Sequence, residues 1–176
     1  MTTYESSIAT RDESVELPIP SIATSKSHNL QLEEDISSLF REGKRERFES
    51  GYESNFARQI RYMIDSHSEQ AINIIASLIL AETANPDVAD EALRWIGNMR
   101  KPDTHLARRR LLELCLLQSD NLFVRDGAGL GLASMDDPDA LPAVKAAIEN
   151  EHNLELKGDL QQVYDQLIET QLERAK

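Results

Sequence analysis

One segment of this chain repeats an earlier segment at a fixed offset of 36 residues, and this repeat constrains the fold more than any other feature. The two segments share an asparagine, four apolar residues and a proline–aspartate pair. The residues of the earlier segment are Asn85, Val88, Ala92, Ile96, Met99, Pro102 and Asp103. Their equivalents in the later segment are Asn121, Val124, Ala128, Leu132, Met135, Pro138 and Asp139. A period of this length is typical of stacked two-helix units. The repeat therefore predicts an all-α solenoid, an architecture that builds extended binding surfaces more often than catalytic pockets.

Apolar residues recur at helical spacing over most of the chain. They predict helices over residues 30–43, 56–64, 68–80, 86–99, 106–117, 122–135, 140–148 and 154–172. Ser66–Ser68 is expected to form a turn, with Ser68 as the N-cap of the helix that follows. No run of residues has the alternation of a strand. The pattern thus predicts about three helical pairs with flanking helices.

The N-terminal segment differs in composition from the rest. Residues 1–29 are rich in serine, threonine and proline, with aperiodic apolar residues, so we expect a disordered tail followed by one solenoid domain over residues 30–176. The stretch Leu17–Ile22 within the tail fits either a linker or a short docking peptide.

Charge and cysteine content narrow the functional classes. The net charge of −12 disfavours binding to nucleic acid or to an anionic membrane. A single cysteine, Cys115, rules out an intramolecular disulfide. No signal peptide or membrane-length apolar run is visible, so we expect a cytoplasmic protein without a membrane partner. The histidines have no metal-ligand spacing, and no catalytic constellation stands out, which predicts no metal, no cofactor and no enzymatic activity.

The third repeat has a specific order of residues. Val124–Arg125, Ala128 and Leu132 precede the segment Asp136–Pro142 and then Lys145–Ile148. This order resembles a HEAT repeat, and it is most similar to the short bacterial type first noted in phycobilisome lyases. The similarity is good over residues 121–150, fair over 85–118 and 153–168, and weak before 84. It implies an α-solenoid whose Val-Arg helices line the concave face, and it implies no activity.

The helical register then predicts which residues face a partner. With Val124, Ala128 and Leu132 in the core, the outward positions are Asp126 and Leu130 and their equivalents in the neighbouring repeats. The predicted partner-binding residues are Asp90, Arg94, Asp126, Leu130 and Gln162. Arg125 corresponds to the family's arginine position, which implies a structural ladder with an acid such as Asp159 or Asp90.

Two further groups of residues have alternative interpretations. A basic cluster, which fits either pairing between repeats or an anion patch, contains Arg100, Lys101, Arg108, Arg109 and Arg110. The glycines Gly127, Gly129 and Gly131 lack the spacing of a dinucleotide-binding loop. We expect there either close helix packing or a shallow floor that a ligand or a partner chain approaches.

Three functional hypotheses remain open. The first is a non-enzymatic protein-interaction module, an adaptor or regulator, whose concave face binds a partner protein, such as one with a basic surface. The second is a tetrapyrrole-handling role related to the phycobilin lyases, with Arg94 and Trp95 as the candidate site, although Trp95 is expected on the buried stripe. The third is nucleic-acid binding through the basic cluster, against which the net charge argues.

Overall fold

The computed structural model describes residues 22–49 and 51–176, which form seven α-helices and two short 3-10 helices without a strand. The α-helices are α1 (Ile22–Gly43), α2 (Asn55–Leu80), α3 (Pro86–Asn98), α4 (His105–Gln118), α5 (Leu122–Met135), α6 (Leu141–Asn150) and α7 (Leu154–Arg174). Helix α1 begins at Ile22, earlier than the expected Leu30. The tail predicted to be disordered and the stretch 17–22 therefore lie largely outside the described residues.

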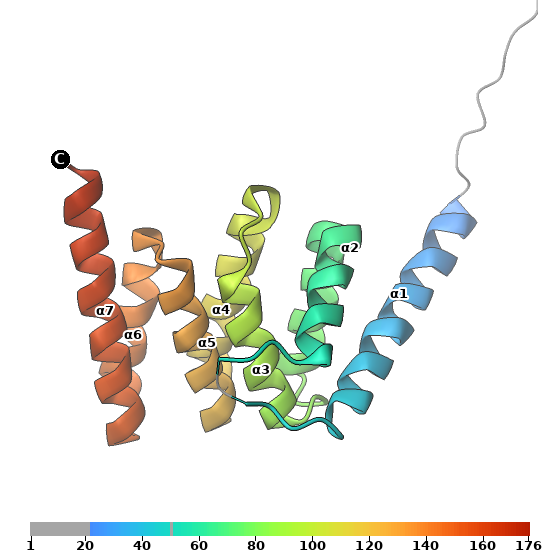
Figure 1. Ribbon diagram of the computed structural model, residues 1–176, viewed down its shortest axis with the longest axis horizontal. Coiled ribbons are helices and arrows are strands. Elements are labelled where there is room, and N and C mark those ends of the chain that lie inside the picture. The colour runs from blue at the N-terminus through green and yellow to red at the C-terminus, as the bar shows by residue number, and fades with distance from the viewer. Residues whose placement is uncertain (1–21, 50) are drawn as a thin grey trace, which may run out of the picture.

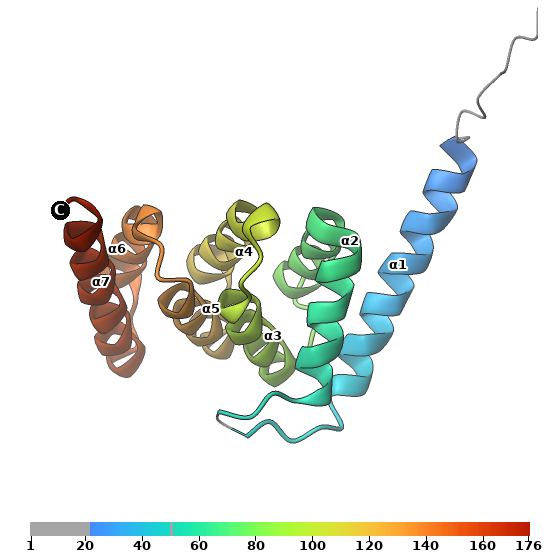
Figure 2. The same cartoon turned by 45° about the horizontal axis from the view of Figure 1, so that its top comes forward.

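The helices stack side by side from α1 at one end to α7 at the other (Figures 1 and 2). Helix α5 contacts both α3 and α7, while α4 contacts both α2 and α6. The helices α3, α5 and α7 thus form one layer, and their partners form a second layer behind it. The apolar stripes of both layers meet in one continuous core. This arrangement confirms the predicted all-α solenoid.

The repeated asparagines explain where the helices of the first layer begin. The Asn85 side chain accepts a hydrogen bond from the Val88 amide, and Asn121 and Asn153 accept corresponding bonds from Phe123 and Leu156. Each asparagine satisfies a backbone donor that has no partner within its helix. The same chemical signal therefore starts α3, α5 and α7, which keeps the three helices in equivalent positions.

Helix α2 differs from the predicted pair of helices separated by a turn. The chain continues through Ser66–Ser68 with a kink, at which Ser68 adopts a positive φ of 50°. A single residue in the left-handed region is enough to redirect the helix without a connecting loop. The predicted break is therefore confirmed in position, but it is a kink within one long element.

The glycines of α5 allow an unusually close approach to α3. A Cβ on Gly97 would lie 2.1 Å from the carbonyl oxygen of Gly131, and a Cβ on Gly127 would lie 2.7 Å from the Cα of Asp90. Real Cβ atoms do not approach backbone atoms so closely. Close packing of two helices, as expected from the sequence, is therefore the reason for glycine at these positions.

Candidate functional site

Three of the predicted partner-binding residues form one ionic network on the first layer. The Arg94 Nε atom donates to Asp90 Oδ1 at 2.9 Å, and its Nη2 atom donates to Asp126 Oδ2 at 3.3 Å. Burial raises the pKa of Asp90, an effect that Arg94 opposes. Leu130 is exposed on α5, while Gln162 is exposed on α7 and donates to Asp159. The network thus joins α3 to α5, and the other two residues lie on the same layer.

Between α1 and α2, residues 44–49 and 51–54 pass in front of this layer, and we call them the connector (Figure 1). Its Ser54 hydroxyl donates to the buried carboxylate of Glu91 on α3 at 2.8 Å. The Phe48 ring lies 5.9 Å from the ring of Phe56. The polar contact therefore holds the connector against α3, and the aromatic contact holds it against α2.

A cavity of about 510 Å³ lies between the connector and the first layer. Its lining residues come from the connector, α3 and α5: Phe48, Glu49, Gly51, Tyr52, Asp90, Glu91, Arg94, Trp95, Asn98 and Ser134. The cavity therefore includes two of the predicted partner-binding residues and several residues that sequence reasoning missed. The aromatic residues Phe48 and Tyr52, within a polar segment of a chain with few aromatics, were the available signal.

Trp95 does not lie in the core, as its place on the apolar stripe had predicted. Its side chain is half-buried and lines the cavity, and its Nε1 atom donates to Glu91 Oε1 at 2.9 Å. The Arg61 guanidinium carbon lies 5.9 Å from the centre of the ring. Arg94, the other residue expected to hold a tetrapyrrole, already has two carboxylate partners. Because Glu49, Asp90 and Glu91 also line the cavity, its electrostatics disfavour a ligand with propionates.

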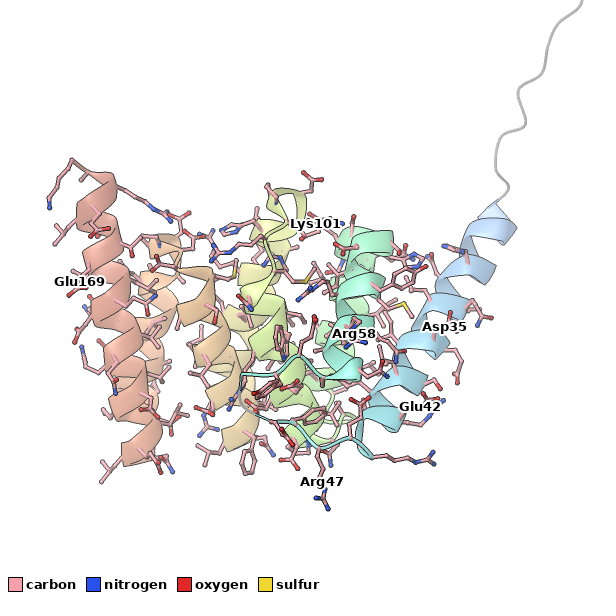
Figure 3. All side chains as sticks on the ribbon, viewed as in Figure 1. Asp35, Glu42, Arg47, Arg58, Lys101 and Glu169 are labelled. Atoms are coloured by element: carbon pink, nitrogen blue, oxygen red, sulfur yellow. The ribbon has the colours of Figure 1, made fainter. Side chains whose placement is uncertain are left out.

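The five cations of the basic cluster are not gathered into one exposed surface. Arg108 is 1% exposed and donates to the carbonyls of Ile96 and Lys101. Lys101, at the turn after α3, donates to the carbonyl of Asp65 at 2.9 Å (Figure 3). Burial leaves Arg108 inaccessible to an external anion, and Lys101 is engaged within the fold.

Arg109 is also engaged by carboxylates of the next repeat. Its Nη1 atom lies 3.0 Å from Asp137 Oδ2 and 2.6 Å from Asp139 Oδ2. Burial raises the pKa of Asp137, but hydrogen bonding from His105 and the charge of Arg109 outweigh it and lower the pKa overall. Only Arg100 and Arg110 of the cluster are exposed. Pairing between repeats, one of the two alternatives drawn from the sequence, accounts for Arg109.

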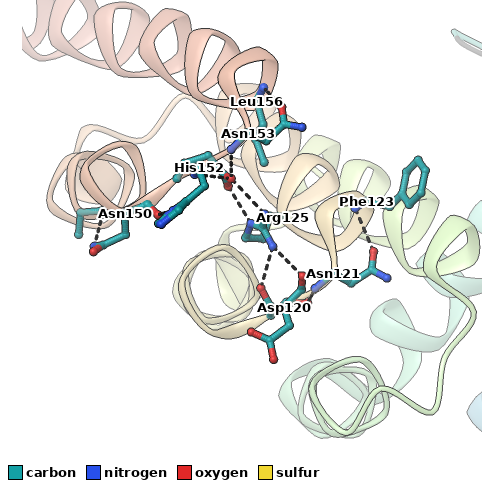
Figure 4. Close-up of polar contacts among 11 residues, drawn as sticks. Asp120, Asn121, Phe123, Arg125, Asn150, His152, Asn153 and Leu156 are labelled. Carbon is teal, nitrogen blue, oxygen red and sulfur yellow. Dashed lines mark hydrogen bonds and ion pairs between the residues drawn. The ribbon is translucent and has the colours of Figure 1, made fainter.

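Arg125 forms the structural ladder that the sequence implied, but with a different acid. Its Nε and Nη2 atoms donate to both carboxylate oxygens of Glu151, at 2.8 and 3.1 Å (Figure 4). The Nη1 atom donates to the carbonyls of Ser119 and Asp120. The expected partners, Asp159 and Asp90, were wrong, because Glu151 precedes α7 and faces Arg125 across the turn. Arg125 thus ties the end of α4 to the start of α7.

This ion pair predicts a pH-dependent stability. The hydrogen bond from Arg125 lowers the pKa of Glu151 below its ordinary value of 4.5, although burial opposes this. The carboxylate therefore stabilises the fold above pH 4.5, and this stabilisation is lost as the pH falls through the folded-state pKa. We expect Glu151→Gln to lower the free energy of unfolding by about 2 kcal/mol at neutral pH. Urea titrations at several pH values should show this difference shrinking in acid, and a constant difference would contradict the assignment.

The remaining candidate chemical groups of the described residues offer no catalytic or metal-binding chemistry. Cys115 is fully buried in the core, and burial raises the pKa of its thiol to about 12, so it is an inert packing residue, as expected. Among these residues, no cluster of three or more histidine, cysteine or carboxylate side chains is placed to hold a metal ion. None of the described helices combines the length and apolar character needed to span a bilayer.

Comparison with known proteins gives one match. A family model described as HEAT repeats matches residues 75–164, which include α3 to α6 and half of α7. No curated protein and no solved structure gave a significant match to the chain. The matched residues include the Asp90–Arg94–Asp126 network and the α3 wall of the cavity.

Proposed function

Because the chain belongs to the HEAT-repeat family, we propose that it is a non-enzymatic adaptor or regulator that binds a basic partner protein along the α3/α5/α7 layer. HEAT repeats generally mediate protein–protein interaction, since their stacked helices present long surfaces. The family is generally non-enzymatic. The partner's basic character is our inference from the charges of this layer.

The observation that carries the proposal is the unequal charge of the two layers. The helices α3, α5 and α7 contain nine acidic residues, Asp87, Asp90, Glu91, Asp126, Glu155, Asp159, Asp165, Glu169 and Glu173. They contain four basic residues, Arg94, Arg125, Lys157 and Arg174. By contrast, the helices of the second layer, α2, α4 and α6, contain six basic and four acidic residues. Six of these nine acids of the first layer are exposed, whereas Arg174 is the one exposed residue among its four bases. The exposed surface of the first layer is therefore negative.

Exposed apolar side chains lie among these acids. Phe123 and Leu130 on α5 are 52% and 37% exposed, and Leu154 at the start of α7 is 85% exposed. Phe123 lines a shallow hollow together with Asp126 and Asp159. Protein interfaces combine apolar contacts with charge complementarity in this way. A partner surface with lysines or arginines around apolar residues would complement this layer.

The test compares two charge-reversal variants with the same change in net charge. The layer variant carries Asp87→Lys, Glu155→Lys and Asp159→Lys, whereas the control variant carries Glu33→Lys, Glu42→Lys and Glu69→Lys on α1 and α2. All six residues are exposed, so we expect the helix content measured by circular dichroism to be unchanged. Each variant and the wild type are then used to purify binding proteins from extracts of the native cell.

We expect a basic protein to be recovered with the wild type and the control, and to be lost with the layer variant or at high salt. Recovery of the same proteins with the layer variant would contradict the proposed surface. Partners without basic surfaces would contradict the proposed charge complementarity.

A further inference from the structure

The cavity behind the connector has aromatic walls that come from two parts of the chain. Phe48 and Tyr52 lie on the connector, and Trp95 lies on α3. The hydrogen bond from Trp95 to Glu91 fixes the orientation of the indole, and Ser54 holds the same carboxylate from the connector side. The indole of Trp95 is therefore held in place before any ligand arrives.

The charges that face this cavity favour a cation. Three carboxylates line it, Glu49, Asp90 and Glu91, against one cation, Arg94. Arg94 already forms ion pairs with Asp90 and Asp126. Arg61, which lies above the Trp95 ring, forms an ion pair with Glu53 at 2.6 Å. Burial keeps the pKa of Asp90 raised despite Arg94, so its carboxylate lacks full compensation and would gain from a further positive charge.

We propose that this cavity receives a lysine or arginine side chain of the basic partner, held between the aromatic rings and the carboxylates of Glu49 and Asp90. Aromatic faces attract cations, and carboxylates add direct charge pairing. The volume of about 510 Å³ admits a long side chain together with the backbone beside it. The inference rests on the proposed function, since the cavity opens on the layer that would bind the partner.

Trp95 is the only tryptophan of the chain, so its fluorescence reports on this cavity alone. The probes are an oligolysine peptide, an oligoglutamate peptide of the same length and lysine amide as a free amine. Anisotropy of a labelled oligolysine measures total binding to the protein. Tryptophan emission measured in the same titration reports whether the cavity is occupied.

The cavity variant is Glu49→Gln with Tyr52→Ala, and the matched control is Glu33→Gln with Tyr62→Ala. These four side chains are exposed, and the control pair does not line the cavity. We expect a saturable change of tryptophan emission with oligolysine and none with oligoglutamate. The cavity variant should weaken this response about tenfold, and the control variant should leave it unchanged.

The outcomes separate this inference from the proposed function. Oligolysine binding that leaves the tryptophan emission unchanged overturns the cavity site, and so does binding that is equally tight in the cavity variant. If the layer variant of the preceding section loses that binding, the acidic layer is still supported. An equally tight response to lysine amide overturns the assignment to a partner's side chain, because a free amine would then suffice. No oligolysine binding at all overturns the cavity site as well, while recovery of a basic partner from cell extract would still support the layer.

Discussion

Gly97→Ala is expected to lower the free energy of unfolding by about 3 kcal/mol, because the added methyl group would overlap the backbone of α5. The new Cβ would lie 2.1 Å from the Gly131 carbonyl oxygen, and a backbone atom cannot move aside as a flexible side chain can. The two helices would have to separate along their contact. Urea denaturation followed by circular dichroism measures the loss.

Gly158 provides the matched control for this substitution. It lies within α7, is exposed, and a Cβ there would have no neighbour within 4 Å apart from its own chain neighbours and the backbone of its own helix. Gly158→Ala should therefore raise the free energy of unfolding by roughly 0.5–1 kcal/mol through helix propensity alone. If both alanine variants are stabilised alike, the close contact of α3 and α5 is wrong.

Arg108→Met is expected to cost about 3 kcal/mol, although the change removes a buried charge. The guanidinium donates to the Ile96 carbonyl at 2.9 Å, to the Lys101 carbonyl at 3.0 Å and to the Thr104 hydroxyl at 3.2 Å. Methionine would fill much of the volume but would remove the shorter hydrogen bonds to both carbonyls. The Ile96 and Lys101 carbonyls would keep only longer bonds, including those from the Met99 and Thr104 amides at 3.4 and 3.3 Å. Burial lowers the pKa of Arg108, which indicates how much the charged form loses by desolvation. Removing this desolvation cost offsets only part of the stability lost with the three hydrogen bonds.

The neighbouring arginine allows a direct comparison. Arg110 lies two positions further along α4 and is exposed, so Arg110→Met should change stability by less than about 0.5 kcal/mol. Chemical denaturation of both variants tests the difference. Equal stability of the two variants would mean that Arg108 does not hold the turn between α3 and α4.

The repeat in the sequence was sufficient to predict most of the fold. Helix α5 has the predicted bounds, Leu122–Met135, because Asn121 caps its first turn and the apolar stripe ends at Met135. These signals are local, since they depend on residues within one or two turns. The kink at Ser68 was only partly predictable. Periodicity located the break in the helix, but it did not predict whether a loop or a kink would form there.

The candidate site was less accessible from sequence because its contacts are long-range. Ser54 reaches Glu91 across 37 positions, and no periodic pattern links the connector to α3. Arg108 was placed in a surface cluster because its neighbours Arg109 and Arg110 suggested one. The helical rotation between adjacent residues instead turns Arg108 into the core and Arg110 outward. The sequence shows which residues are charged, but the side of the helix on which a charged side chain lies depends on how the helix is rotated against its neighbours.

The opposite charges of the two layers give the molecule an electric dipole across its thickness. A charged body that approaches such a molecule exerts a torque on it before the surfaces touch. A basic partner would therefore turn the α3/α5/α7 layer toward itself during diffusion, and a nucleic acid would turn the opposite layer toward itself. The difference in charge between the two layers thus selects the orientation of the first encounter, before any individual contact forms.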